Sequence, residues 1–232
     1  MPELVRIGIV DSGCRADQLP KVLACAGFTL SEGQLQRVDA LADQLGHGSE
    51  IVDIIAWEAP EARFLVAQVF RERLATSAGQ VAMAIDWLVT QGAQVINLSL
   101  GLRPDRDVLA LACARALKAG VILCASAPAR GAAVYPAAYP GVFRMTGDAR
   151  CDRGEISYLE SEHADFGAHV RPLGASGAGV GASAGCAYLT GEVARYLRTG
   201  GRPVLSRVRR FLIERACYRG PERRVGSDRT ER

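Results

Sequence analysis

Three short segments of this sequence carry residues that could share the steps of one reaction. An apolar run ends directly in Asp11, and turn residues follow it. His47, one of three histidines, lies between two glycines, and Ser183 follows a glycine-rich stretch. A hydroxyl that attacks, an imidazole that takes its proton and an acid that fixes the tautomer of the imidazole are the three groups of nucleophilic acyl transfer.

Each residue also has a simpler interpretation when it is taken alone. Asp11 and Ser183 could be an ordinary turn residue and a helix cap, and a lone histidine is often a polar surface residue. Together they are more informative, because the acid follows a strand while His47 and Ser183 each open a helix. A helix N-terminus beside Ser183 can also stabilise an oxyanion. The chain order acid, imidazole, hydroxyl is one of those in which catalytic triads occur.

The elements that must position these residues alternate along the chain. Short apolar runs rich in Val and Ile predict strands at residues 5–10, 63–70, 94–100, 120–125 and 142–146. Apolar residues spaced by three and four predict helices at residues 49–57, 78–91, 107–118, 184–198 and 204–217. This alternation predicts an α/β fold, with a doubly wound, mainly parallel sheet and helices on both faces. Sites in such sheets form at the carboxyl ends of the strands.

Composition and charge indicate one globular domain with a basic end. The 232 residues are 49% hydrophobic and 23% charged, and the net charge of +3 gives no sign of nucleic-acid binding. We expect a minimal domain over residues 1–217 and a basic, disordered tail over residues 218–232. From residue 198 onward there are 11 arginines and 4 acids, a net charge of +7. This end is either a solvated surface or a dock for an acidic partner.

The cysteines and the N-terminal segment indicate the compartment. Seven cysteines, an odd number with no CxxC pair, favour reduced thiols over disulfides or a zinc site. The start, MPELVRIGIVDSG, lacks the features of a secretory signal. No run of about 18 apolar residues predicts a membrane span. We therefore expect a cytoplasmic protein without metal or cofactor.

Five segments in order resemble the motifs of the subtilisin family. They are IVDSG, GHGSEIVDII, VINLSLG, YPAAYPGVFRMTG and GASAGCAYLTG, and the resemblance extends over about residues 5–195. It implies a subtilisin-like three-layer fold and a serine endopeptidase whose catalytic triad is Asp11, His47 and Ser183. It also implies that residues Ser99, Leu100 and Gly101 pair with the backbone of a peptide substrate as an added strand.

The chain departs from the family where an asparagine side chain completes the oxyanion hole. Our alignment places Ala129 at that asparagine and Pro128 at a neighbouring glycine, and neither side chain can donate a hydrogen bond. Loss of this donor in subtilisin costs about 10²–10³ in turnover. We therefore expect a slow, selective protease, and the alternative is a weak or inactive subtilase-like module that binds peptides.

Other groups could serve as the missing donor. The candidates are the backbone N–H of Ser183 and the side chains of Ser126, Asn97 and Arg130. The resemblance also places Arg130 near the rim of the S1 pocket, where its charge would favour an acidic or polar P1 side chain.

The layout also bears on the class of substrate. A short chain that starts almost at its first strand, with no propeptide or signal, is similar to small cytoplasmic subtilases that remove leader peptides from modified precursors. A nucleotide-binding protein is the competing class, because GVGASA at residues 179–184 loosely fits a dinucleotide fingerprint. That fingerprint should follow the first strand of a βαβ unit. Here it lies late, with no clear strand before it, which argues against this class.

Overall fold

The computed structural model describes residues 4–174 and 180–222. The glycine-rich loop expected at residues 174–181 therefore lies largely outside the described residues. The same is true of the tail from residue 223 onward.

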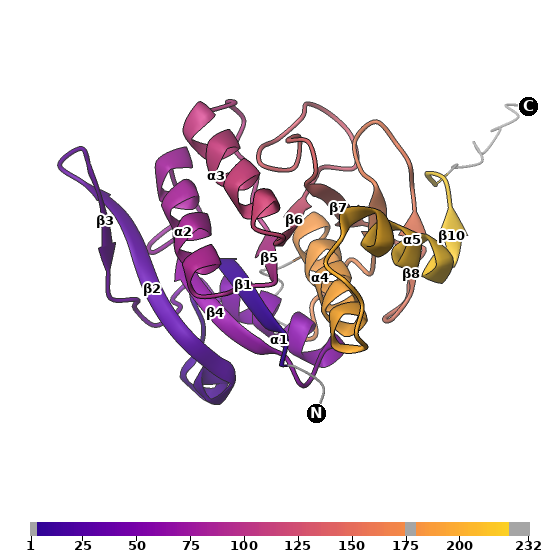
Figure 1. Ribbon diagram of the computed structural model, residues 1–232, viewed down its shortest axis with the longest axis horizontal. Coiled ribbons are helices and arrows are strands. Elements are labelled where there is room, and N and C mark those ends of the chain that lie inside the picture. The colour runs from indigo at the N-terminus through magenta and orange to yellow at the C-terminus, as the bar shows by residue number, and fades with distance from the viewer. Residues whose placement is uncertain (1–3, 175–179, 223–232) are drawn as a thin grey trace, which may run out of the picture.

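One ten-stranded sheet runs through the molecule, in the order β10-β8-β9-β7-β6-β5-β1-β4-β2-β3 (Figure 1). The strands are β1 (Arg6–Asp11), β2 (Val22–Ser31), β3 (Gln34–Val38), β4 (Arg63–Gln68), β5 (Val95–Leu98), β6 (Ile122–Ser126), β7 (Phe143–Gly147), β8 (Ile156–Tyr158), β9 (Phe166–Ala168) and β10 (Tyr218–Arg219). All neighbouring strands are parallel except the pairs β2–β3 and β8–β9. The mainly parallel sheet is thus confirmed.

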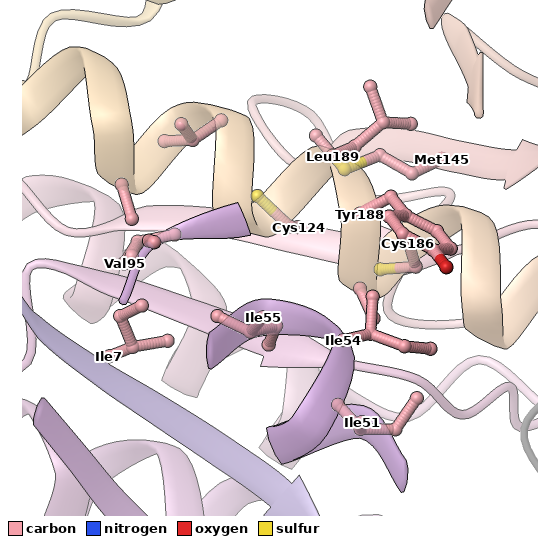
Figure 2. Packing of buried hydrophobic residues seen from close by; sticks show 14 of the residues in the cluster. Ile7, Ile51, Ile54, Ile55, Val95, Cys124, Met145, Cys186, Tyr188 and Leu189 are labelled. Carbon is pink, nitrogen blue, oxygen red and sulfur yellow. The ribbon is translucent and has the colours of Figure 1, made fainter. Parts of the chain in front are cut away.

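Helices cover both faces of this sheet. They are α1 (His47–Glu58), α2 (Ala78–Thr90), α3 (Asp107–Lys118), α4 (Ala182–Arg198) and α5 (Leu205–Arg215), with a short 3-10 helix, η1 (Ala16–Lys21). Helices α1, α4 and α5 pack in one apolar core and α2 and α3 in the other. Figure 2 shows part of the first core, which includes Ile54 and Ile55 of α1 and Tyr188 of α4. The predicted α/β fold with two covered faces is confirmed.

The hairpin of β2 and β3 is the largest part of the sheet that the apolar pattern did not predict. It forms one end of the sheet, as Figure 1 shows. Strand β3 is almost entirely exposed and β2 is buried only at its centre, so neither reads as a continuous apolar run. The turn between them uses Glu32 and Gly33, both with positive φ, which suits the two-residue hairpin turn.

The sheet also continues past the domain boundary expected at residue 217. Strand β10 pairs with β8, and the backbone N–H groups of Cys217 and Gly220 donate to Ile156 O and Tyr158 O, each at 2.8 Å. Arg150 stacks over the ring of Tyr218 at 5.3 Å. Backbone pairing rather than apolar burial holds this segment, which is why its polar sequence suggested a tail.

None of the helices in residues 4–174 and 180–222 has the length and apolar character needed to cross a bilayer.

Candidate active site

The acid and the imidazole predicted from the sequence meet at the carboxyl end of β1. Asp11 is the last residue of that strand and is fully buried. Its Oδ1 accepts a hydrogen bond from Ser12 N and lies 2.7 Å from Nδ1 of His47, the first residue of α1. With the carboxylate ionised, Nδ1 carries the ring proton and donates a hydrogen bond to Asp11 Oδ1. The Nε2 atom is then left as the base.

The side chain of Asp43 fixes the start of the helix that carries His47. One carboxylate oxygen accepts from Leu45 N and Gly46 N at 3.1 and 2.9 Å, and the other from Ser49 N and Ser49 Oγ at 2.9 and 2.6 Å. The bond from Ser49 N satisfies one of the N–H groups that a helix leaves free in its first turn, and those from Leu45 N and Gly46 N hold the turn that precedes it. Asp43 was not among the residues predicted from the sequence. Its signal is an acid of a type that favours turns, four residues before the histidine.

Backbone packing brings α1 close to the segment after Asp11. A Cβ atom on Gly48 would collide with Gly13 O, and Gly48 N donates to Ser12 Oγ at 2.8 Å. Only glycine allows this approach. The imidazole of the adjacent His47 is therefore placed by contacts between two backbones.

Ser183 is the second residue of α4, whose N-terminus rests on strand β7. Gly181 before it has φ +69°, and a Cβ atom on Gly185 would collide with Thr146 O. Ser183 N is one of the backbone donors that a first helical turn leaves free. Ser183 Oγ donates to Ser99 O at 3.4 Å, and Ser99 Oγ donates to Ser183 O at 3.3 Å.

His47 and Ser183 line one cavity of about 330 Å³. The other residues of its wall are Ser99, Leu100, Gly101, Leu102, Ser126, Phe70, Leu74, Ala75 and Thr76. The structure therefore gathers the base, the hydroxyl and the expected substrate strand around one space. The wall formed by the segment after β4, which includes Phe70 and Leu74, was not anticipated from the sequence. In the described part of the chain, no group of three or more His, Cys, Asp or Glu side chains is arranged to hold a metal ion.

The other candidate oxyanion donors lie in different places. Ser126 lines the cavity, and its Oγ donates to Leu100 O at 3.4 Å. Asn97 is directed into the core against α4, where Nδ2 donates to Thr190 Oγ1 at 2.9 Å. Ala129 and Arg130 are both exposed on the segment after β6, and neither is among the residues that line the cavity.

The electrostatic surroundings favour the protonated form of His47. Burial disfavours the imidazolium, but the Asp11 carboxylate and, at longer range, Asp43 and Glu50 outweigh it. The pKa of His47 is therefore raised above its ordinary value. A raised pKa makes the neutral imidazole a stronger base towards a nearby hydroxyl.

Comparison with known proteins assigns the family. Residues 4–177 match the subtilase family, and the chain belongs to it. It is 29% identical over 151 residues to a thermostable alkaline protease of Halalkalibacterium halodurans, covering 60% of this chain and 40% of that protein. It is 28% identical over 163 residues to the major intracellular serine protease of Bacillus subtilis, covering 61% and 50%. The chain thus spans half or less of the length of these two relatives.

Solved structures show the same fold at lower identity. A psychrophilic protease aligns with a TM-score of 0.68 and 19% identity, covering 91% of this chain and 82% of that one. A lanthipeptide protease aligns with a TM-score of 0.65 and 17% identity, covering 89% and 78%. The protease domain of PatA aligns with a TM-score of 0.59 and 20% identity, covering 88% and 84%.

Proposed function

We propose that this protein is a serine endopeptidase that hydrolyses a peptide bond through an acyl-enzyme on Ser183. The observation that carries the proposal is the buried hydrogen bond of 2.7 Å between Asp11 and His47. His47 lines the same cavity as Ser183. Membership of the subtilase family supports it independently.

In this mechanism the three side chains act in sequence. His47 Nε2 takes the proton of Ser183 as its oxygen attacks the substrate carbonyl, and later gives that proton to the leaving amine. Asp11 holds the imidazole and stabilises its charged form. The Ser183 hydroxyl must first turn from Ser99 O, its acceptor in this structure, towards His47. Catalytic hydrogen bonds of this kind often tighten only when substrate is present.

The cavity suits an extended peptide. Residues 99–101 would pair with the substrate backbone as an added strand, and Phe70 and Leu74 give the facing wall an apolar character. The exposed Arg130 would favour an acidic or polar P1 side chain through Coulomb attraction.

The oxyanion would be held mainly by the backbone N–H of Ser183, at the positive end of the α4 dipole. Ser126, which lines the cavity, is the side-chain donor that the geometry favours over Asn97. With Ala129 at the family's asparagine position, we expect turnover below that of digestive subtilisins.

We further propose that the enzyme is a selective cytoplasmic processing protease that removes a leader peptide from a precursor. All seven cysteines are free, which suits a reducing compartment. One relative is an intracellular protease, and one protein of the same fold is a lanthipeptide protease. Among small subtilases that process modified precursors, the one that serves quinohemoprotein amine dehydrogenase maturation gives the first precursor to test.

The basic C-terminal region would dock an acidic segment of this partner. Arg207 and Arg210 are exposed on α5, and Arg202 is exposed just before it. By contrast, Arg209 and Arg215 are engaged with Asp165 and Glu192. A charge-reversed Arg207→Glu/Arg210→Glu variant should raise KM for the precursor and leave kcat unchanged.

A catalytically weak or inactive peptide-binding module is the second candidate. It is favoured by two observations, the alanine at position 129 and the Ser183 hydroxyl bonded to Ser99 O. The two candidates differ in whether Ser183 is an activated nucleophile.

Labelling and cleavage distinguish them. The protein is exposed to a fluorophosphonate probe and, separately, incubated with candidate precursors whose products are read by mass spectrometry. We expect labelling and one specific cut, both abolished in Ser183→Ala and both retained in Ser206→Ala, a serine on the exposed side of α5. Peptide binding without labelling would support the binding module. Cleavage that persists in Ser183→Ala would refute the proposed mechanism.

A further inference from the structure

Cys14 and Cys25 bring their sulfur atoms to 3.8 Å of each other beside the candidate active site. Cys14 lies three residues after Asp11 and is buried, whereas Cys25 lies on β2 and is exposed. The two thiols are within hydrogen-bonding reach, and one of them faces solvent. This pair takes no part in the proposed reaction.

The segment that carries Cys14 also supports the helix of the catalytic base. Cys14 O accepts a hydrogen bond from Asp43 N at 3.3 Å, and the side chain of Asp43 fixes the first turn of α1. The preceding residue, Gly13, is the one against which Gly48 packs. A displacement of residues 12–14 would therefore reach His47 through two separate contacts.

The environment of the pair favours the thiolate at Cys14 and not at Cys25, because the hydrogen bond with Cys14 and burial both raise the pKa of the Cys25 thiol. The hydrogen bond from the Cys25 thiol lowers the pKa of Cys14, although burial and the carboxylates of Asp43 and Asp17 oppose the shift. By contrast, burial raises the pKa of Cys113 and Cys151 to about 12. A thiolate is the reactive form of cysteine towards oxidants.

We propose that Cys14 and Cys25 are a redox modification site, at which a peroxide produces a disulfide that slows the reaction at Ser183. One thiolate attacks a peroxide oxygen, the O–O bond breaks and the released hydroxide takes a proton to leave as water. The sulfenic acid formed is then attacked by the other thiol, the S–O bond breaks and a second water leaves. Two thiols and hydrogen peroxide thus give one disulfide and two waters.

The disulfide would act on the site through geometry. A disulfide holds its sulfurs about 2.05 Å apart, so the present separation of 3.8 Å must shorten by nearly half. Because Cys25 is held in the sheet by its pairing with Val66 of β4, we expect the loop at residues 12–14 to be the part that moves. A misplacement of about 1 Å in a catalytic group can cost on the order of 10²-fold in rate. This effect rests on the proposed function, whereas formation of the disulfide does not.

The test treats the whole protein with hydrogen peroxide and reads three signals. Intact mass should fall by two hydrogens, and peptide mapping should place the new bond between Cys14 and Cys25. Hydrogen exchange at residues 43–50 should quicken. Cleavage, or fluorophosphonate labelling, should slow at least tenfold and recover with dithiothreitol. In Cys25→Ser none of these changes should occur, whereas Cys217→Ser, at another exposed cysteine, should behave as the parent protein.

The outcomes separate the two proposals. No disulfide, or one between other cysteines, overturns the modification site. If a Cys14–Cys25 disulfide forms but hydrogen exchange and activity are unchanged, the proposal that the disulfide slows the reaction at Ser183 is overturned. A reduced protein that neither cleaves nor labels speaks against the proposed function alone, because mass and hydrogen exchange still report on the pair.

Discussion

Two regions next to the candidate active site are built in different ways, one side tightly packed and the other exposed. Where α1 and α4 begin, the chain is packed so tightly that Gly48 and Gly185 leave no room for a Cβ atom. After β6, residues 129–133 are all exposed, and this segment includes Ala129, which we predict to take the position of the family's oxyanion asparagine. The residues proposed as base and nucleophile, His47 and Ser183, thus lie beside close backbone packing, which tolerates little change. A side-chain donor on an exposed segment can be replaced without disturbing the packing of the fold.

Gly48→Ala should produce the largest effect, because it alters the tightly packed side. The added methyl group would collide with Gly13 O and push the first turn of α1 away from Asp11. We expect the loss of the 2.7 Å Asp11–His47 contact and a fall in kcat/KM of about 10²-fold or more. Steady-state kinetics on the cleaved precursor measure this change.

The matched control is Gly174→Ala, whose new methyl group meets no atom of residues 4–174 and 180–222 within 4 Å. It should leave kcat/KM unchanged. Circular dichroism and thermal melting of both variants show whether Gly48→Ala is still folded. A folded Gly48→Ala variant with full activity would mean that backbone packing does not place His47.

Ala129→Asn should have the next largest effect, in the opposite direction. If Ala129 occupies the family's asparagine position, a restored amide can donate to the oxyanion, and kcat should rise by about tenfold. The donor in subtilisin contributes about 10²–10³, which sets the upper limit. The gain should appear in kcat rather than KM, because the oxyanion exists only in the transition state and the tetrahedral intermediate.

Ala129→Leu separates size from chemistry, since leucine resembles asparagine in shape but cannot donate. It should give no gain. If Asn and Leu behave alike, either the alignment at this position is wrong or another group, such as Ser126, already fills the role.

The comparison between the two sides also explains what the sequence could predict. Apolar runs located β1, β4, β5, β6 and β7, and the residues at the ends of β1 and the starts of α1 and α4 were identified from their types. These features are local, so a window of residues contains them. The hairpin of β2 and β3 and strand β10 are held by pairing with distant strands, and their exposed residues give no apolar pattern.

Side chains whose role depends on distant partners were equally hard to foresee. Asn97 was a plausible donor from its position, but only the fold shows that its amide is bound to Thr190. The apolar wall at Phe70 and Leu74 follows from how the segment after β4 lies over the cavity. Both depend on the path of the chain in space, which local patterns do not contain.

Asp43→Asn should give the smallest effect on the tightly packed side, and it tests charge as well as packing. An asparagine has one acceptor oxygen, so the bonds from Ser49 or those from Leu45 and Gly46 are lost. Loss of a helix cap costs about 1 kcal/mol of stability. If this destabilises the active conformation relative to an inactive one, kcat should fall about fivefold.

The pH profile separates the two roles of Asp43. Its carboxylate is one of the charges that raise the pKa of His47, so its removal should lower that pKa. The neutral base then persists to lower pH, and the acid limb of kcat/KM should shift to lower pH. Asp53→Asn, on the helix that carries His47 but bound to Arg15 and Gln18, should leave the limb in place. If Asp43→Asn lowers the rate but leaves the acid limb of kcat/KM in place, Asp43 acts only as a helix cap. Loss of the cap changes the amount of active enzyme, whereas the position of the limb depends on the pKa of His47.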